Sequence, residues 1–200
     1  MHGLINRSIE SFVTDTYGQS VWNDATLLAN IGFDSFEALL PYDDKLTLHL
    51  LDAIAARLER PVETVLEDLG TYLVSHPSLE RLRRLLRFGG RNFAEFLFSL
   101  DDLRDRARLA VPDLDIPQLE VSAQGGGVYY VYSTWGVDGF GHVLVGILRA
   151  MADDYGDLIF LDHEGSANQR EVLKITVVAN EFSDGRDFHL LDRNERSSHG

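Results

Sequence analysis

Arginines form one of two charged clusters whose residue types and spacing are suited to chemistry. Positions 80, 84, 87 and 91 fall on one stripe of a helix, which would present Arg84, Arg87 and Arg91 to an anion or an acidic partner. The same face can pair with Glu80 and Glu95 in solvent, and this is the simpler interpretation. The arginines of the cluster are Arg81, Arg83, Arg84, Arg87 and Arg91.

The second cluster is Asp162-His163-Glu164, whose three side chains are all of kinds that bind metal ions. Successive residues of a strand point to opposite faces, so three adjacent residues do not converge on one ion. We therefore predict a solvated turn at the end of a strand here, and no metal site.

No established catalytic pattern is found in the sequence. Phosphate loops, dinucleotide fingerprints, nucleophile elbows and zinc-protease motifs are all missing, and the seven histidines are scattered. The acidic pairs Glu67-Asp68 and Asp101-Asp102 suit helix N-termini better than general acid–base catalysis. The sequence therefore predicts a protein that is not an enzyme and has no catalytic residues.

Composition narrows the choice of partner and compartment. The chain has 200 residues and a net charge of −14, which disfavours binding to nucleic acid or to an anionic membrane surface. No run approaches the roughly 20 apolar residues of a membrane span. The absence of cysteine excludes disulfides and thiolate metal sites and fits a reducing, cytoplasmic location.

Hydrophobic periodicity divides the elements into two kinds. Helical spacing dominates the first hundred residues, where Gly70 is expected to end or bend a helix. Strand patterns follow over 119–134, around the turn Gly125-Gly126-Gly127, and again over 158–161 and 172–178, with a helix over 140–155 between them. This order predicts an α+β fold. We expect one domain over 1–191, with a helical N-terminal subdomain (1–60), a helix/sheet subdomain (61–191) and a flexible tail (192–200).

Short motifs spread along nearly the whole chain together resemble the heme-nitric oxide/oxygen-binding (H-NOX) domain family. Each motif is weak alone, but they occur in family order at near-family spacing. The matching segments are Met1-His2-Gly3-Leu4-Ile5-Asn6, Phe12, Tyr17-Gly18, Trp22, Glu67-Asp68-Leu69-Gly70, Phe88-Gly89-Gly90, Phe93, Phe96-Leu97, Leu100-Asp101-Asp102-Leu103, Val111-Pro112-Asp113-Leu114, Pro117, Gly139, Val143, Gly146-Ile147-Leu148 and Tyr155-Gly156.

The resemblance implies both a fold and a function. It implies helices closing over a helix and a four-stranded antiparallel sheet, with heme b held between the two parts. It also implies a sensor of nitric oxide or oxygen that signals to a separate protein such as a histidine kinase or a diguanylate cyclase. Arg84, Arg87 and Arg91 are our proposed contact stripe for that partner.

The sequence departs from the family at the residue that would ligate iron. In the family a histidine follows the leucine that corresponds to Leu103, whereas here Arg104 stands in that place, thirteen positions before Pro117. A guanidinium stays protonated and has no lone pair to offer iron. No histidine occurs between His76 and His142, so a shift in alignment does not supply the ligand.

The family's propionate-binding motif, Tyr-x-Ser-x-Arg, is also absent. Tyr132 and Ser133 are adjacent here, and Trp135 or Gly136 stands where arginine belongs. No arginine lies between Arg108 and Arg149. The large side chain of Trp135 would fill volume that heme otherwise occupies.

The remaining positions matched to the family pocket are apolar and include Ile5, Ile9 and Leu73. Without a distal hydrogen-bond donor, nitric oxide would be the expected gas if heme bound. His142 begins the late helix and is a possible substitute ligand, although a capping or partly exposed role suits it better.

Two hypotheses follow. The first is a regulatory binding module that has kept the fold and lost heme, so that no cofactor is bound in the standard mode. The second is a heme-based nitric oxide sensor with an unusual axial ligand such as His142 or His76. The missing iron ligand and the missing propionate motif favour the first hypothesis.

Overall fold

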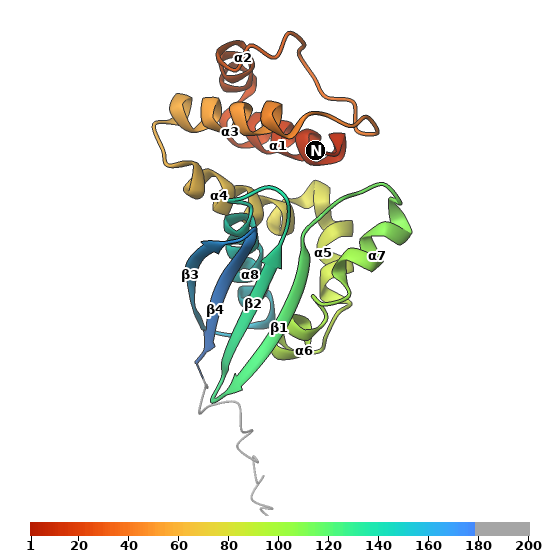
Figure 1. The fold of residues 1–200 in the computed structure, drawn as a ribbon, viewed down its shortest axis with the longest axis vertical. Coiled ribbons are helices and arrows are strands. Elements are labelled where there is room, and N and C mark those ends of the chain that lie inside the picture. The colour runs from red at the N-terminus through yellow and green to blue at the C-terminus, as the bar shows by residue number, and fades with distance from the viewer. Residues whose placement is uncertain (179–200) are drawn as a thin grey trace, which may run out of the picture.

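The computed structural model describes residues 1–178, apart from the side chain of Arg81, and places a helical part above a sheet-containing part (Figure 1). The upper part holds α1–α3, and α4 lies between it and the part below. The helices are α1 (Gly3–Tyr17), α2 (Gln19–Leu28), α3 (Asp44–Leu58), α4 (Val62–Ser75), α5 (Glu80–Arg87), α6 (Phe93–Phe98), α7 (Leu103–Ala110) and α8 (Gly141–Tyr155), with a 3₁₀ turn at Pro77–Leu79.

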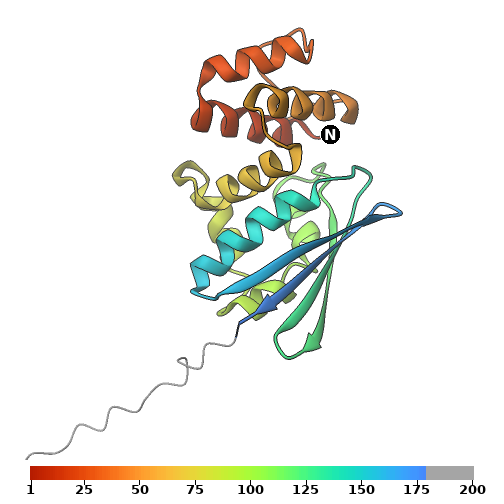
Figure 2. The same ribbon diagram turned by 90° about the vertical axis from the view of Figure 1, so that its left-hand side faces the viewer.

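Four antiparallel strands form one sheet in the order β1-β2-β4-β3. They are β1 (Gln118–Gly125), β2 (Val128–Thr134), β3 (Ile159–Ala167) and β4 (Arg170–Val177). Alternation along β2 and β4 points Val131 and Leu173, which are paired partners, into a fully buried layer. Figure 2 shows α8 lying along this face of the sheet. The predicted α+β class and order of elements are confirmed.

Local sequence signals account for several helix ends. The Asp43 carboxylate accepts a hydrogen bond from the amide of Lys45 at the start of α3, and Asn92 caps α6 through the amide of Glu95. Gly156 ends α8 with a φ of 77°, a left-handed conformation that glycine adopts without strain.

Close contact between α4 and α8 depends on two glycines. A Cβ on Gly70 would lie 2.0 Å from the carbonyl oxygen of Val143, and a Cβ on Gly146 would lie 2.0 Å from that of Glu67. Gly70 lies inside α4 and does not end it, so the expected helix end was wrong, whereas the expected bend stays a prediction. The glycine serves the packing of α4 on α8 instead.

Two clusters of buried side chains form the core, and α4 contributes to both. Leu69 of α4 packs with the N-terminal helices, whereas Val74 of the same helix packs with α8 and the sheet. The boundary between the two core clusters therefore runs along α4. The subdomain boundary at residue 60 stays a prediction, and the expected tail at 192–200 lies outside the described residues.

The segment Asp162-His163-Glu164 lies within β3, so the predicted solvated turn was wrong. The His163 ring is half-buried because alternation along β3 turns it to the same face as its partner Leu173, and the strand continues past a bulge between His163 and Gly165. A strand with exposed alternate residues has the same local polarity as a turn, which explains the error.

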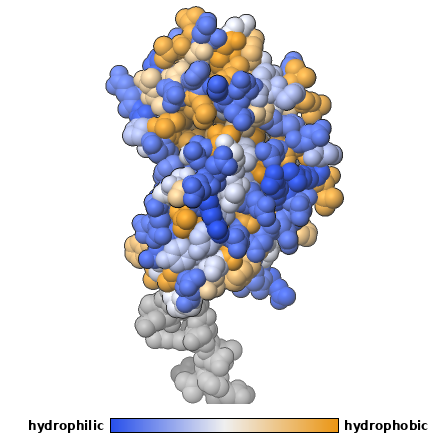
Figure 3. All heavy atoms as spheres, viewed as in Figure 1, coloured by the Kyte–Doolittle hydropathy of each residue, from blue (hydrophilic) through white to orange (hydrophobic). Residues whose placement is uncertain are grey.

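The surface is mostly hydrophilic, as the net charge requires, but apolar residues interrupt it over the N-terminal helices (Figure 3). Exposed leucines of this part include Leu27, Leu28 and Leu39. None of the helices within residues 1–178 is both long and apolar enough to cross a bilayer.

Candidate ligand-binding cavity

A cavity of about 270 Å³ lies between the N-terminal helices and the sheet-containing part. Almost all of its wall is aliphatic or aromatic. Ser8 contributes a hydroxyl, but this group donates to the carbonyl oxygen of Leu4 at 2.9 Å. The lining residues are Leu4, Ile5, Ser8, Leu69, Leu73, Leu82, Leu85, Leu86, Leu103, Ala107, Leu114, Ile116, Pro117, Leu119, Trp135, Phe140, Val143, Leu144 and Ile147.

Helical periodicity explains why these residues face one space. Leu69 and Leu73 are four residues apart on α4, and Leu103 and Ala107 have the same spacing on α7. Residues spaced in this way lie on one face of a helix, so each helix presents a single apolar stripe. The cavity forms where these stripes meet without complete interdigitation.

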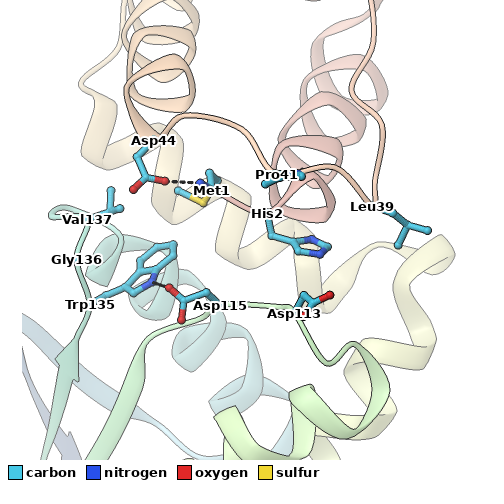
Figure 4. Close-up of a pocket in the computed structure, with 10 residues that line it drawn as sticks. All are labelled: Met1, His2, Leu39, Pro41, Asp44, Asp113, Asp115, Trp135, Gly136 and Val137. Atoms are coloured by element: carbon cyan, nitrogen blue, oxygen red, sulfur yellow. Dashed lines mark hydrogen bonds and ion pairs between the residues drawn. The ribbon is translucent and has the colours of Figure 1, made fainter.

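The segment 113–116 separates this cavity from a second, more polar one of about 400 Å³, here called the vestibule. Leu114 and Ile116 face the apolar cavity, whereas Asp113 and Asp115 face the vestibule. Trp135 lines both. Figure 4 shows the vestibule, whose lining residues are Met1, His2, Leu39, Pro41, Asp44, Asp113, Asp115, Trp135, Gly136 and Val137.

Asp115 joins α7 to the loop after β2 through two hydrogen bonds. The Arg104 guanidinium donates from Nη2 to Oδ1 of Asp115 at 2.6 Å, and the indole Nε1 of Trp135 donates to Oδ2 at 3.0 Å. We call this arrangement the Arg104–Asp115–Trp135 bridge. Burial alone would raise the pKa of the Asp115 carboxyl, but the Trp135 and Arg104 hydrogen bonds and the charges of Arg104 and Arg108 outweigh it, so the pKa is lowered.

The bridge explains where Arg104 lies. Its side chain turns toward Asp115, beside the cavity, and is not part of the cavity lining. Within the described residues, its buried Nε has no hydrogen-bond partner. The guanidinium therefore depends on Asp115 to offset the cost of partial burial.

Of the other predicted cofactor-site residues, some line the cavity and others lie elsewhere in the fold. Ile5, Leu73, Pro117 and Trp135 line the cavity. Trp135 leaves a cavity beside it, so its indole does not fill the whole space. Ile9 lies among the buried residues of the N-terminal core and is not in the lining.

Tyr132 and Ser133 point to opposite faces of β2 and do not act together. The Arg170 guanidinium lies 4.2 Å from the centre of the Tyr132 ring on the outer face, whereas Ser133 is buried on the inner face. Neither residue lines the cavity.

His142 lies at the start of α8 and outside the cavity lining. Its ring stacks on that of His163 at 4.4 Å between centroids, and its Nδ1 is 3.3 Å from Oε1 of Glu67. His163 in turn approaches the buried Glu171 at 3.1 Å. His142 therefore belongs to a polar network that joins α4, α8, β3 and β4.

His76 is likewise remote from the lining. It ends α4, stacks on Tyr72 at 4.6 Å and has Nδ1 at 2.7 Å from the hydroxyl of Ser78.

The arginine stripe is not continuous. Arg84 pairs with Glu80 at 2.6 Å, and the Arg87 guanidinium lies over the Tyr155 ring at 5.1 Å. Because α5 ends at Arg87, Arg91 lies beyond the helix, where its backbone amide donates to the Glu95 carboxylate. The predicted pairing of Arg84 with Glu80 is present.

Sequence reasoning missed Asp115 and its neighbours. The available signal was the alternation Asp113-Leu114-Asp115-Ile116, in which polar and apolar residues take opposite sides of an extended segment. Without a partner strand, that pattern does not reveal which cavity each side faces.

Comparisons with known proteins place these features in a family. The model of the family described as Haem-NO-binding matches residues 2–163. The chain is 27% identical to soluble guanylate cyclase gcy-31 of Caenorhabditis elegans over 117 residues, which are 58% of this chain and 17% of that protein. It is 22% identical to soluble guanylate cyclase 89Db of Drosophila melanogaster over 156 residues, 78% of this chain and 23% of that protein.

Solved structures show the same fold. An H-NOX protein from S. oneidensis in the Fe(II)NO ligation state matches with a TM-score of 0.74 and 16% identity, over 90% of this chain and 100% of that chain. An H-NOX mutant from K. algicida matches with a TM-score of 0.76 and 16% identity, over 91% and 99%. The chain spans only about a fifth of the length of the two cyclases. Because the family model covers residues 2–163, the chain belongs to the Haem-NO-binding family.

Proposed function

We propose that this chain is a heme-free member of its family that regulates a separate signalling protein. The observation that carries the proposal is the composition of the cavity wall. Within residues 1–178, the lining contains no histidine, cysteine, methionine or tyrosine. Iron in heme is held by imidazole, thiolate, thioether or phenolate groups, so the wall offers no axial ligand.

The surroundings of the cavity are equally unsuited to the heme propionates. Asp44, Asp113 and Asp115 line the vestibule. Arg104, which stands at the family's iron-ligand position, lies beside the cavity, but its guanidinium already pairs with Asp115. Among the described residues, Asp44 is paired with the Met1 ammonium and Asp115 with Arg104 and Arg108, so these cations are already engaged and none is left free for two further carboxylates. The residues present therefore do not fit heme.

The bridge suggests how an occupied cavity would influence the surface. Trp135 and the α7 residues Leu103 and Ala107 all line the cavity, and the bridge connects the loop that carries Trp135 to α7. A ligand that displaces the indole would therefore also move the carboxylate that holds Arg104. The protein would then have two arrangements, one with the bridge in place and one with the indole displaced. The ligand would shift the population toward the arrangement that it binds more tightly, by an amount set by the difference between its two affinities.

The receiver of the signal is proposed to be a histidine kinase or a diguanylate cyclase, as the family resemblance implies, or a guanylate cyclase, as the names of the relatives suggest. The relatives gcy-31 and 89Db are guanylate cyclases by name, which supports a cyclase. Arg84 has a side chain that is 73% exposed and is our first choice for the contact. An Arg84→Glu variant should weaken partner binding while it leaves folding unchanged.

A hemin titration tests the heme-free proposal. Purified protein is titrated with hemin and followed by absorbance, beside an H-NOX protein that binds heme. We expect no saturable Soret band at one equivalent. A stoichiometric band that moves on addition of nitric oxide would contradict the proposal and would favour the sensor hypothesis with an unusual ligand.

A further inference from the structure

The shape and lining of the apolar cavity restrict what can enter it. Its volume of about 270 Å³ is near the lower end of small-molecule sites, which span roughly 300–1,000 Å³. A cavity walled by leucine, isoleucine, valine and phenylalanine holds water poorly and gains free energy from an apolar occupant.

The polar groups on the wall are already engaged. The Ser8 hydroxyl donates to the carbonyl of Leu4, and the Trp135 N–H donates to Asp115. A charged or strongly polar ligand would lose its hydration here and find no donor to replace it. The wall therefore selects against charge inside the cavity.

The vestibule beside the cavity adds negative charge near its wall. Asp113 and Asp115 lie on the vestibule side of the same segment whose Leu114 and Ile116 face the cavity. Asp115 pairs with Arg104 and Arg108, whereas Asp113 forms no ion pair among the described residues, so an anion held near this segment would be repelled mainly by Asp113.

We propose that the cavity binds an uncharged, hydrocarbon-rich small molecule of about the size of a substituted naphthalene, which contacts Trp135. This inference rests on the proposed heme-free function, because heme would occupy the same space. Within residues 1–178, the apolar wall, which offers a charged group no free hydrogen-bond donor, and the unpaired charge of Asp113 disfavour anionic amphiphiles of similar size.

Two fluorescent probes with one skeleton test the charge requirement. N-phenyl-1-naphthylamine is uncharged, and 8-anilinonaphthalene-1-sulfonate is the same anilinonaphthalene with a sulfonate. Titrated into the full chain, the uncharged probe should bind at one equivalent, with at least roughly tenfold higher affinity than the sulfonate, a difference of about 1.4 kcal/mol.

A matched pair of variants locates the bound probe. Ala107→Phe places a ring in the cavity from α7, whereas Ala110→Phe adds the same ring at an exposed position of the same helix. We expect at least roughly tenfold weaker binding of the uncharged probe for Ala107→Phe and less than twofold change for Ala110→Phe. Should Ala107→Phe fail to fold, Ser8→Phe fills the cavity from α1.

A second pair separates the vestibule from the general negative charge. Asp113→Asn removes a charge from the vestibule, and Asp52→Asn removes the same charge from an exposed site on α3, about two turns beyond Asp44. Asp113→Asn should bind the sulfonate probe about threefold more tightly than the native chain does, and Asp52→Asn should change the affinity for this probe by a smaller factor.

The outcomes distinguish the two proposals. Absence of binding of the uncharged probe, by a protein that also takes up no hemin, would overturn this inference and leave the heme-free function standing. Equal affinity for both probes, or unchanged binding in the filled variant, would also overturn it. Stoichiometric uptake of hemin would instead overturn the proposed function.

Discussion

The wall of the cavity and its rim differ in what the fold requires of them. Residues of the wall such as Leu69, Leu86 and Leu144 also belong to the buried core, so folding preserves them whatever the cavity binds. The rim is formed by the Arg104–Asp115–Trp135 bridge, in which the Asp115 side chain is 58% exposed and that of Arg104 28%. A family fold can therefore persist while the polar chemistry that selects the ligand changes.

The largest expected loss of stability comes from a change at the contact between α4 and α8, behind the cavity wall. Gly146→Ala would place a methyl group 2.0 Å from the Glu67 carbonyl oxygen and 2.7 Å from the Thr71 amide. Because both neighbours are backbone atoms, α4 and α8 must separate, and this outweighs the better helix propensity of alanine. We predict a loss of about 3 kcal/mol or more in the free energy of unfolding, measured by urea denaturation.

Gly136→Ala is the matched control, since no atom lies within 4 Å of the added Cβ at this position of the vestibule. Its expected effect is within about 0.5 kcal/mol. Similar losses in the two variants would show that the wall is no more constrained than the rim.

Changing the rim should alter ligand chemistry without loss of the fold. Arg104→His supplies a lone pair beside the cavity, whereas Arg104→Ala opens the same space without a ligand. We predict at least roughly tenfold tighter hemin binding for the histidine variant than for the alanine variant, by absorbance titration. Equal affinities would mean that position 104 does not control access to iron.

The same contrast explains which features were predictable from sequence. The spacing of hydrophobic residues and the glycines at turns and helix ends predicted the order of helices and strands, because both reflect local conformation and burial. Ile5, Leu73, Pro117 and Trp135 were assigned to one pocket only through the family resemblance, and all four line the apolar cavity. The pairing of Asp115 with Arg104 depends on tertiary contacts between segments eleven residues apart, which no local pattern encodes.

A smaller effect is expected when the bridge is broken. Asp115→Ala leaves the Arg104 guanidinium and the Trp135 N–H without their shared acceptor. Because solvent screens this half-exposed pair, the predicted loss of unfolding free energy is only about 1 kcal/mol. Asp113→Ala, its neighbour on the vestibule, should cost less than about half as much. The reverse order would exclude the bridge as a structural contact.

The smallest effect concerns pH. The pKa of Asp115 is lowered from its ordinary value of 3.8, so the folded state holds the ionised form more firmly than the unfolded state does. Its contribution is complete well above pH 3.8 and is lost as pH falls below that value. The difference in unfolding free energy between the native chain and Asp115→Asn should therefore stay constant from pH 7 to about pH 5 and shrink below pH 3.8. A difference that disappears near neutral pH would contradict this assignment.

The heme content of the protein purified from heme-replete cells tests the central claim most directly. Total heme is measured as the pyridine hemochrome and divided by protein concentration. An apolar wall without an iron ligand predicts fewer than about one heme per ten chains. A ratio near one, with a Soret band that responds to nitric oxide, would contradict the account.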